Sequence, residues 1–136
     1  MNVKHLDHVN MSVADLAASE AWYARVFGFQ RVEDGIYEGR PWAILKSGEA
    51  MLCLYEHPER REPDPEVHGH HGASHFGLRI VDRKAWEATV AKEKVEIFYG
   101  GPVRWPRSTA WYVQDPTGYE IEVACWDDDQ VRFPAA

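Results

Sequence analysis

The sequence predicts an α+β protein built from two tandem βαβββ modules, which form a curved mixed sheet around a central cavity. Three observations lead to this interpretation: short runs in which apolar and polar residues alternate, a helical stretch after two of these runs, and a repeat of the whole order of elements in the second half of the chain. The length of 136 residues suits one domain, with a first module over 3–56, a linker over 57–73 and a second module over 74–133.

The first module begins with a strand over residues 8–13. Alternation places His8 on the opposite face from three apolar residues, Val9, Met11 and Val13. Asp15 can then cap a helix over residues 16–27, which Gly28 can end. The core-facing residues of this helix are expected to be Leu16, Tyr23, Val26 and Phe27. Three further strands are expected at 29–32, 42–46 and 50–55, separated by turn residues.

The linker is rich in proline, glycine and charge and has no apolar periodicity. It contains four histidines, His57, His68, His70 and His71. A histidine-rich tract can bind a metal on its own. Because such a segment offers no fixed geometry, we expect these histidines to be solvated.

The second module repeats the first in order and in phase. His75 corresponds to His8 by a shift of 75 − 8 = 67, and the same shift places Asp82 on Asp15 as the cap of a helix from Arg83 to about Lys92. The three strands that follow are expected at 96–99, 110–114 and 119–125. A shift of 122 − 53 = 69 makes Cys53 the counterpart of Glu122.

The stretch around residues 111–123 indicates two strands joined by a tight turn. Asp115, Pro116, Thr117 and Gly118 have the chemistry of a reverse turn. Beyond this turn, Glu120 and Glu122 share one face of the last strand, while Ile121 and Val123 share the other. We assign Glu120 to solvent and Glu122 to a metal.

Three side chains are then expected to project into the central cavity, namely His8, His75 and Glu122. Two imidazoles and one carboxylate form a divalent-metal site with positions left open for water or substrate. The candidate metals are Fe²⁺, Mn²⁺, Zn²⁺ and Ni²⁺. His5 lies outside the repeat phase and on the opposite strand face, so it is not included.

Composition bounds the partners and the location. The formal charge is −7, which argues against nucleic acid or an anionic membrane surface and favours a small-molecule partner. Neither a signal-peptide core nor an apolar run of ~20 residues is present, so a cytoplasmic location is expected. Cys53 and Cys125 lie in apolar runs and are expected to be reduced core thiols.

These motifs resemble the vicinal oxygen chelate superfamily over nearly the full chain. The matching pieces are Asp7-His8-Val9, the Trp22-Tyr23 helix ending at Phe27-Gly28-Phe29, His75-Phe76-Gly77-Leu78, and the stretch 112–122. The superfamily includes glyoxalase I, extradiol dioxygenases, fosfomycin-resistance enzymes and bleomycin-binding proteins. The resemblance implies paired βαβββ modules around a metal held by His8, His75 and Glu122, commonly in a homodimer.

The resemblance leaves the reaction open. Glyoxalase-like members have a fourth ligand where this chain has Cys53, and a packed thiol is the favoured reading of that residue. Residues 101–104 with the turn at 115–118 look like the extradiol dioxygenase signature, except that Arg104 and Trp105 stand where that signature has a histidine. Tyr112, ten residues before Glu122, fits a substrate-contacting tyrosine of the fosfomycin-resistance enzymes.

The expected function is that of a divalent-metal-dependent enzyme of the glyoxalase or dioxygenase type. Its substrate would chelate the metal through neighbouring oxygens, with Tyr112 and Arg104 as acid or anion contacts. Lyase or isomerase chemistry and dioxygenase chemistry both remain open. The alternatives are a metal-free protein that binds a drug or metabolite, as bleomycin-resistance proteins do, and a fosfomycin-type thiol transferase.

Overall fold

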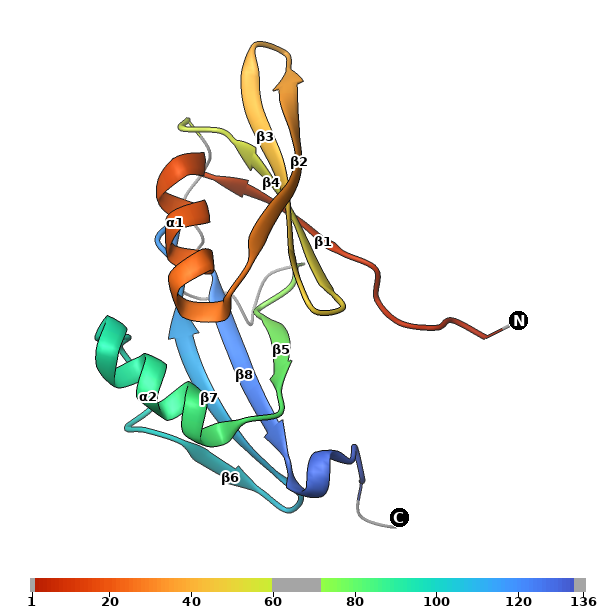
Figure 1. Cartoon of the computed structure of the whole chain (residues 1–136), viewed down its shortest axis with the longest axis vertical. Coiled ribbons are helices and arrows are strands. Elements are labelled where there is room, and N and C mark those ends of the chain that lie inside the picture. The colour runs from red at the N-terminus through yellow and green to blue at the C-terminus, as the bar shows by residue number, and fades with distance from the viewer. Residues whose placement is uncertain (1, 60–71, 134–136) are drawn as a thin grey trace. The chain divides into compact units, whose positions relative to one another are not determined.

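The computed structural model describes residues 2–59 and 72–133. The chain divides into two compact units, unit 1 over residues 1–62 and unit 2 over residues 63–136. Each unit contains one βαβββ module with its own four-stranded mixed sheet (Figure 1). The predicted α+β fold class and the tandem modules are therefore confirmed. The linker histidines His68, His70 and His71, which we expected to be solvated, lie outside the described residues.

Unit 1 contains β1 (Val9–Val13), α1 (Leu16–Phe27), β2 (Gln30–Tyr37), β3 (Arg40–Ser47) and β4 (Ala50–Glu56). Its sheet has the order β1-β4-β3-β2, in which β1 is parallel to β4 and the other pairs are antiparallel. The Asp15 carboxylate caps α1 by accepting the Ala18 N–H at 2.9 Å, and Gly28 ends the helix with φ 69°. Both ends of this helix are therefore as predicted.

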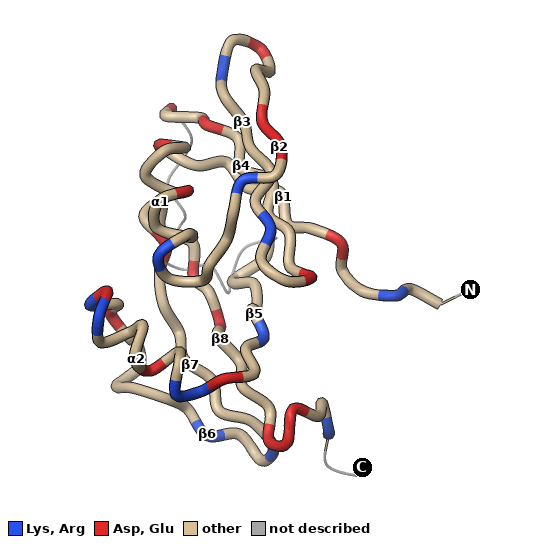
Figure 2. The backbone as a smooth tube through the Cα atoms, in the orientation of Figure 1, with Lys and Arg blue, Asp and Glu red and all other residues tan. Residues whose placement is uncertain are grey.

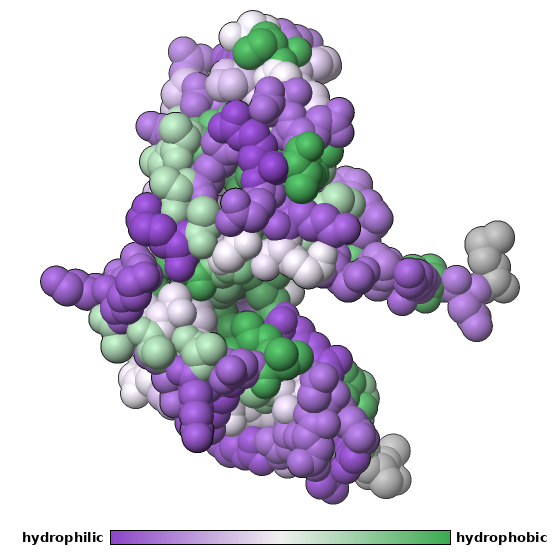
Figure 3. All heavy atoms as spheres, in the orientation of Figure 1, coloured by the Kyte–Doolittle hydropathy of each residue, from purple (hydrophilic) through white to green (hydrophobic). Residues whose placement is uncertain are grey.

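The core of unit 1 lies between α1 and one face of the sheet. Met11 and Val13 of β1 are buried, as their alternation predicts. Tyr23 and Val26 of α1 are buried with Ser19, whereas Phe27 is partly exposed. The outer surface of β2 is less protected, because Val32 and Ile36 are exposed, and apolar side chains interrupt the hydrophilic surface around the β2–β3 hairpin (Figure 3).

Unit 2 contains β5 (Phe76–Ile80), α2 (Arg83–Glu93), β6 (Val103–Trp105), β7 (Ser108–Gln114), β8 (Glu120–Trp126) and the short 3₁₀ helix η2 (Asp127–Asp129). The sheet order β5-β8-β7-β6 repeats that of unit 1. The Asp82 carboxylate caps α2, as predicted from its repeat position. Trp86 of α2 packs edge to face against Trp111 of β7, and Ile121 and Val123 of β8 are fully buried.

The register confirms the internal repeat. Asn10 pairs with Cys53 in the parallel β1–β4 ladder, and Gly77 pairs with Glu122 in the parallel β5–β8 ladder. Cys53 and Glu122 therefore occupy equivalent places in the two sheets, as the sequence shifts predict.

The predicted strand over 96–99 is wrong. The edge strand of unit 2 is instead β6, a few residues later. Tyr99, Gly100 and Gly101 all have positive φ, of 59°, 79° and 119°, so the chain turns where an extended strand was expected. A backbone bond from the Phe98 N–H to the Tyr112 carbonyl at 2.9 Å connects this segment to β7.

Charged residues are spread over both units, and three consecutive acidic residues form η2 (Figure 2). In the part of the chain that the structure describes, no helix is both long and apolar enough to span a membrane.

Candidate functional site

The polar face of β8 carries the candidate site in unit 2. Ile121 and Val123 pack into the core, so strand alternation turns Glu120 and Glu122 to the other face. Tyr112 of β7 is the register partner of Glu122. His75 immediately precedes β5, the strand on the other side of β8. The sheet thus brings three of the predicted site residues, His75, Tyr112 and Glu122, to adjacent positions.

His75 and Glu122 are in direct contact. His75 Nε2 lies 3.1 Å from Glu122 Oε2, and both side chains are partly exposed, at 32% and 25%. The other ring nitrogen, Nδ1, lies 3.3 Å from Ser74 Oγ and 3.7 Å from Glu120 Oε1. The imidazole is therefore held between two carboxylates of the same strand, with Nε2 directed to the predicted metal ligand.

Glu120 is part of this cluster, although the sequence assigned it to solvent. The Tyr99 hydroxyl donates a hydrogen bond to Glu120 Oε2 at 2.6 Å, and this bond, followed by burial, raises the pKa of Tyr99. The sequence could have placed Glu120 in this cluster, because strand alternation puts it on the same face of β8 as Glu122. Tyr99 could not be placed from sequence, because its left-handed backbone interrupts the expected strand.

Tyr112 is held as a neutral phenol beside the two carboxylates. Its ring packs edge to face against His75, with centroids 5.9 Å apart, and against Tyr99, with centroids 5.1 Å apart. Burial raises the pKa of Tyr112, and the negative charge of Glu122 raises it further, while a hydrogen bond from Trp105 acts in the opposite direction. A protonated phenol at this position can donate a hydrogen bond or a proton to a bound oxygen.

Arg104 pairs with Asp127, the first residue of η2. Its Nη1 and Nη2 donate to the two carboxylate oxygens of Asp127 at 2.8 and 2.6 Å, and Nη1 lies 3.3 Å from Thr109 Oγ1. This pairing raises the pKa of Arg104 and lowers that of Asp127. Along β6 the next residue, Trp105, points to the opposite face and bonds to Tyr112. The predicted catalytic role of Arg104 stays a prediction.

His8 lies in unit 1, just before β1. Its Nδ1 is 2.9 Å from Asp7 Oδ2, and its side chain is 45% exposed. Within residues 2–59 and 72–133, no three His, Cys, Asp or Glu side chains are grouped closely enough to hold a metal ion. Since the triad needs a donor from each unit, its completion by His8 stays a prediction.

Both cysteines are free thiols and are partly buried. Burial raises the pKa of Cys53, and the charges of Asp7 and Glu33 raise it further. The sequence predicted core thiols, but neither cysteine is among the buried core residues of the described chain. Leu52 and Leu54 are buried on either side of Cys53, so strand alternation turns Cys53 to the opposite face of β4. Cys53 is therefore not a core thiol.

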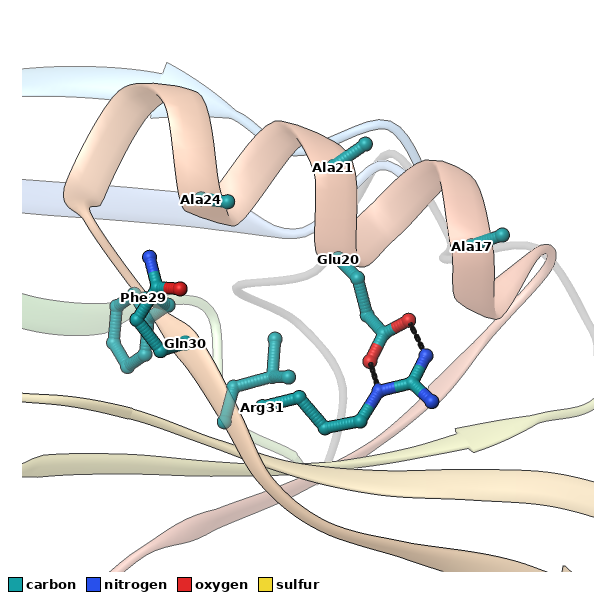
Figure 4. A pocket seen from close by; sticks show the side chains of 8 residues that line it. Ala17, Glu20, Ala21, Ala24, Phe29, Gln30 and Arg31 are labelled. Carbon is teal, nitrogen blue, oxygen red and sulfur yellow. Dashed lines mark hydrogen bonds and ion pairs between the residues drawn. The ribbon is translucent and has the colours of Figure 1, made fainter.

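Unit 2 has a cavity of about 280 Å³ that reaches Glu122, which we call the unit 2 cavity. It runs along β6, β7 and β8, and its other lining residues include Trp105, Arg107, Trp126, Arg132 and Phe133. Unit 1 has a cavity of about 320 Å³ near the β2–β3 hairpin, lined by polar and tyrosine side chains. A further cavity of about 330 Å³ lies between α1 and β2 and is bridged by the Glu20–Arg31 ion pair (Figure 4).

Comparison with known proteins links this geometry to one protein family. The sequence model of the Glyoxalase/Bleomycin resistance protein/Dioxygenase superfamily matches residues 5–123. A glyoxylase/bleomycin resistance protein/dioxygenase domain from Frankia sp. EAN1pec has a TM-score of 0.78 and 17% identity, covering 95% of this chain and 96% of that one.

Two further solved structures are similar over most of their length. A lactoylglutathione lyase from Agrobacterium tumefaciens has a TM-score of 0.66 and 26% identity, covering 91% of this chain and 95% of that one. A glyoxalase/dioxygenase from Nostoc punctiforme has a TM-score of 0.73 and 24% identity, covering 92% of each chain. The fold is thus shared with these proteins over about nine tenths of the chain.

Proposed function

The chain belongs to the Glyoxalase/Bleomycin resistance protein/Dioxygenase superfamily, and from this premise we propose that it is a divalent-metal-dependent enzyme of the glyoxalase or dioxygenase type. Its substrate is a small molecule that presents two neighbouring oxygens. The metal ligands in this proposal are His8, His75 and Glu122. A homodimer in the cytoplasm is part of the same proposal.

The observation that carries this proposal is the contact between His75 and Glu122. Zinc–nitrogen and zinc–oxygen bonds are about 2.0 to 2.2 Å long, so two adjacent ligands of one metal ion are separated by roughly 3 to 3.5 Å. The 3.1 Å between His75 Nε2 and Glu122 Oε2 falls in this range. These donors also suit Fe²⁺, Mn²⁺ and Ni²⁺, since imidazole and carboxylate are ligands for all of them.

The surrounding residues support the geometry of this site. Ser74 Oγ can accept a hydrogen bond from His75 Nδ1–H, and the Glu120 carboxylate lies 3.7 Å from the same nitrogen, so this tautomer leaves Nε2 with a free lone pair. Tyr99 in turn holds Glu120. Such supporting contacts orient an imidazole toward a metal.

When bound, a divalent metal would act as a Lewis acid that polarises the substrate oxygens. Tyr112 is the residue best placed to handle a proton, because its hydroxyl bonds to Glu122 and its raised pKa keeps it protonated. Once Glu122 binds the metal, this hydroxyl would donate its one hydrogen bond to the substrate oxygen on which negative charge develops, in place of Glu122.

The test is metal binding by untagged protein, with matched pairs of variants. Glu122→Gln is expected to weaken affinity by more than about 100-fold, beyond what loss of a supporting residue usually costs, whereas Glu120→Gln on the same strand face should cost about tenfold. His8→Ala is expected to match Glu122→Gln, whereas His5→Ala should bind as the wild type does. Equal losses in both members of each pair would refute the triad. Replacing the histidines at 57, 68, 70 and 71 separates binding by that tract from binding at the site.

The reaction is then assigned with metal-loaded protein. Oxygen uptake with catechols indicates a dioxygenase, and isomerisation of a glutathione hemithioacetal indicates glyoxalase-type chemistry. Transfer of glutathione to fosfomycin indicates a thiol transferase.

A metal-free binding protein is the second candidate, and the unit 2 cavity is the observation that favours it. Trp105, Trp126 and Phe133 give this cavity an aromatic lining suited to stacking. If purified protein has no stoichiometric metal and gains no thermal stability from any of the four metals, the binding protein is the better reading.

A further inference from the structure

The unit 2 cavity has the size and position of a ligand site. Its volume of about 280 Å³ is near the lower limit of about 300 Å³ for small-molecule pockets. Glu122 and Trp126, both in its lining, are four residues apart on β8, a distance of about 13 Å along a strand. The cavity is therefore elongated and small, and it fits a single ring with a short side arm.

Aromatic side chains provide the walls of this cavity. Trp126 and Phe133 pack edge to face with centroids 5.5 Å apart. Trp105 of β6 and Trp126 of β8 are both register partners of Ser108 on β7, the strand between them. Trp105 is 48% exposed and Phe133 is 78% exposed. Large aromatic side chains that remain this exposed beside a cavity are typical of a surface that a ligand covers.

Two guanidinium groups line this cavity, in the part of unit 2 that also contains the aspartates of η2. Arg107, in the β6–β7 turn, and Arg132 both line the cavity. Both terminal nitrogens of Arg104 donate hydrogen bonds to the carboxylate of Asp127. The positive charge of Arg107 also lowers the pKa of Asp127. The Arg132 guanidinium donates to the neutral side-chain oxygen of Gln130. An anionic ligand group would therefore meet guanidinium donors in this part of the cavity.

We propose that the unit 2 cavity binds an aromatic acid, with its ring between Trp105, Trp126 and Phe133 and its anionic group at Arg107 and Arg132. This inference rests on the proposed function, since it places the substrate's reacting oxygens at the Glu122 end of the cavity. It narrows the substrate class to a single-ring aromatic compound with an acidic side arm. Trp105 connects the unit 2 cavity to the proposed metal site, because it lines the cavity and bonds to Tyr112.

The experiment measures binding of three matched probes to the full chain by calorimetry, after divalent metals have been removed with a chelator. The probes are 3-phenylpropanoate, its neutral analogue 3-phenylpropanol, and the saturated 3-cyclohexylpropanoate. We expect the aromatic acid to bind about tenfold tighter than the alcohol, because the guanidinium groups make charge-assisted hydrogen bonds. It should bind about fivefold tighter than the saturated acid, because only an aromatic ring can stack on the tryptophan side chains.

Variants assign these preferences to the cavity. Arg107→Gln combined with Arg132→Gln should reduce affinity for the acid to that for the alcohol, whereas Arg83→Gln on α2 should change nothing. Trp126→Leu should remove the preference for the aromatic acid over the saturated one. Thermal unfolding of each variant checks that it is folded.

Three results would overturn the inference: equal affinity for acid and alcohol, an affinity that the arginine variants leave unchanged, or no binding of the aromatic acid at about 10 mM. The outcomes for the two proposals are separable. Loss of the metal site with retained binding of the aromatic acid would refute the enzyme and leave the cavity proposal standing. A metal-binding protein with no preference for the aromatic acid would refute the cavity proposal alone.

Discussion

Replacing Asp115 by alanine is expected to destabilise unit 2 through the turn that leads into β8. The Asp115 side chain is almost fully buried, at 4% residue exposure. Its Oδ1 accepts three backbone N–H bonds, from Thr117 at 2.9 Å and from Gly118 and Tyr119 at 2.8 Å each. Alanine leaves these donors without that acceptor immediately before the strand that carries Glu120 and Glu122.

The magnitude follows from the number of bonds. A hydrogen bond to a charged acceptor contributes about 1.5 to 3 kcal/mol, and water can reach part of this turn once the carboxylate is gone. Counting about 1 kcal/mol for each lost bond, Asp115→Ala should lower the free energy of unfolding by about 3 kcal/mol. For a chain of this length the midpoint of thermal unfolding should fall by about 10 °C. Asp115→Asn retains an acceptor oxygen and should lose only about 1 kcal/mol.

The assay is urea unfolding followed by tryptophan fluorescence, because Trp86 and Trp111 are buried in the core of unit 2. Glu96→Ala, which removes an exposed carboxylate from the same unit, is the control and should stay within about 0.5 kcal/mol of the wild type. The reasoning is refuted if Asp115→Ala loses less than about 1 kcal/mol, or if the asparagine variant is as unstable as the alanine variant.

Three further predictions test separate parts of the molecule. Tyr112→Phe should lower kcat by about 100-fold on the substrate found, while metal affinity by calorimetry falls by only about tenfold, because the lost hydroxyl bonds to the ligand Glu122; a smaller loss of kcat would exclude general-acid catalysis by this phenol. Arg104 lowers the pKa of Asp127, so the Asp127 carboxylate stabilises the folded state above its unfolded pKa near 3.8, and this stabilisation is lost as the pH falls. The urea midpoints of Asp127→Asn at pH 5 and pH 3 should therefore differ less than those of the wild type. Equal differences in the two proteins would contradict this pairing. Gly35→Ala should cost about 1 to 2 kcal/mol and move the nearby tryptophan, since a Cβ there would lie 2.9 Å from the Trp42 ring; an unchanged emission spectrum and unfolding midpoint would argue against this contact.

Local chemistry made most of the fold predictable. The Asp15 and Asp82 caps and the Gly28 end of α1 each depend on neighbouring residues, and the structure contains them as expected. The repeat was visible because both copies keep the same apolar alternation. The edge strand of unit 2 was misplaced because apolar residues at 97–99 resemble a strand, while the backbone turns at Tyr99 and the glycines that follow.

The candidate site was only partly accessible to the same reasoning. Strand alternation predicted the shared face of Glu120 and Glu122, and the repeat singled out His75. Contacts made by Tyr99 and Trp105 depend on a turn and on an edge strand, whose side-chain directions no periodicity specifies. The pairing of Arg104 with Asp127 joins residues 23 positions apart, beyond the reach of a local pattern.

The most direct test of the proposed function is a crystal structure of the untagged protein grown with Mn²⁺, with the metal located by its anomalous scattering. The account predicts one strong peak at roughly 2.0 to 2.3 Å from His75 Nε2 and from a carboxylate oxygen of Glu122, with His8 as the third protein ligand. A peak at the histidines of 57–71, or no ordered metal near Glu122, would contradict it.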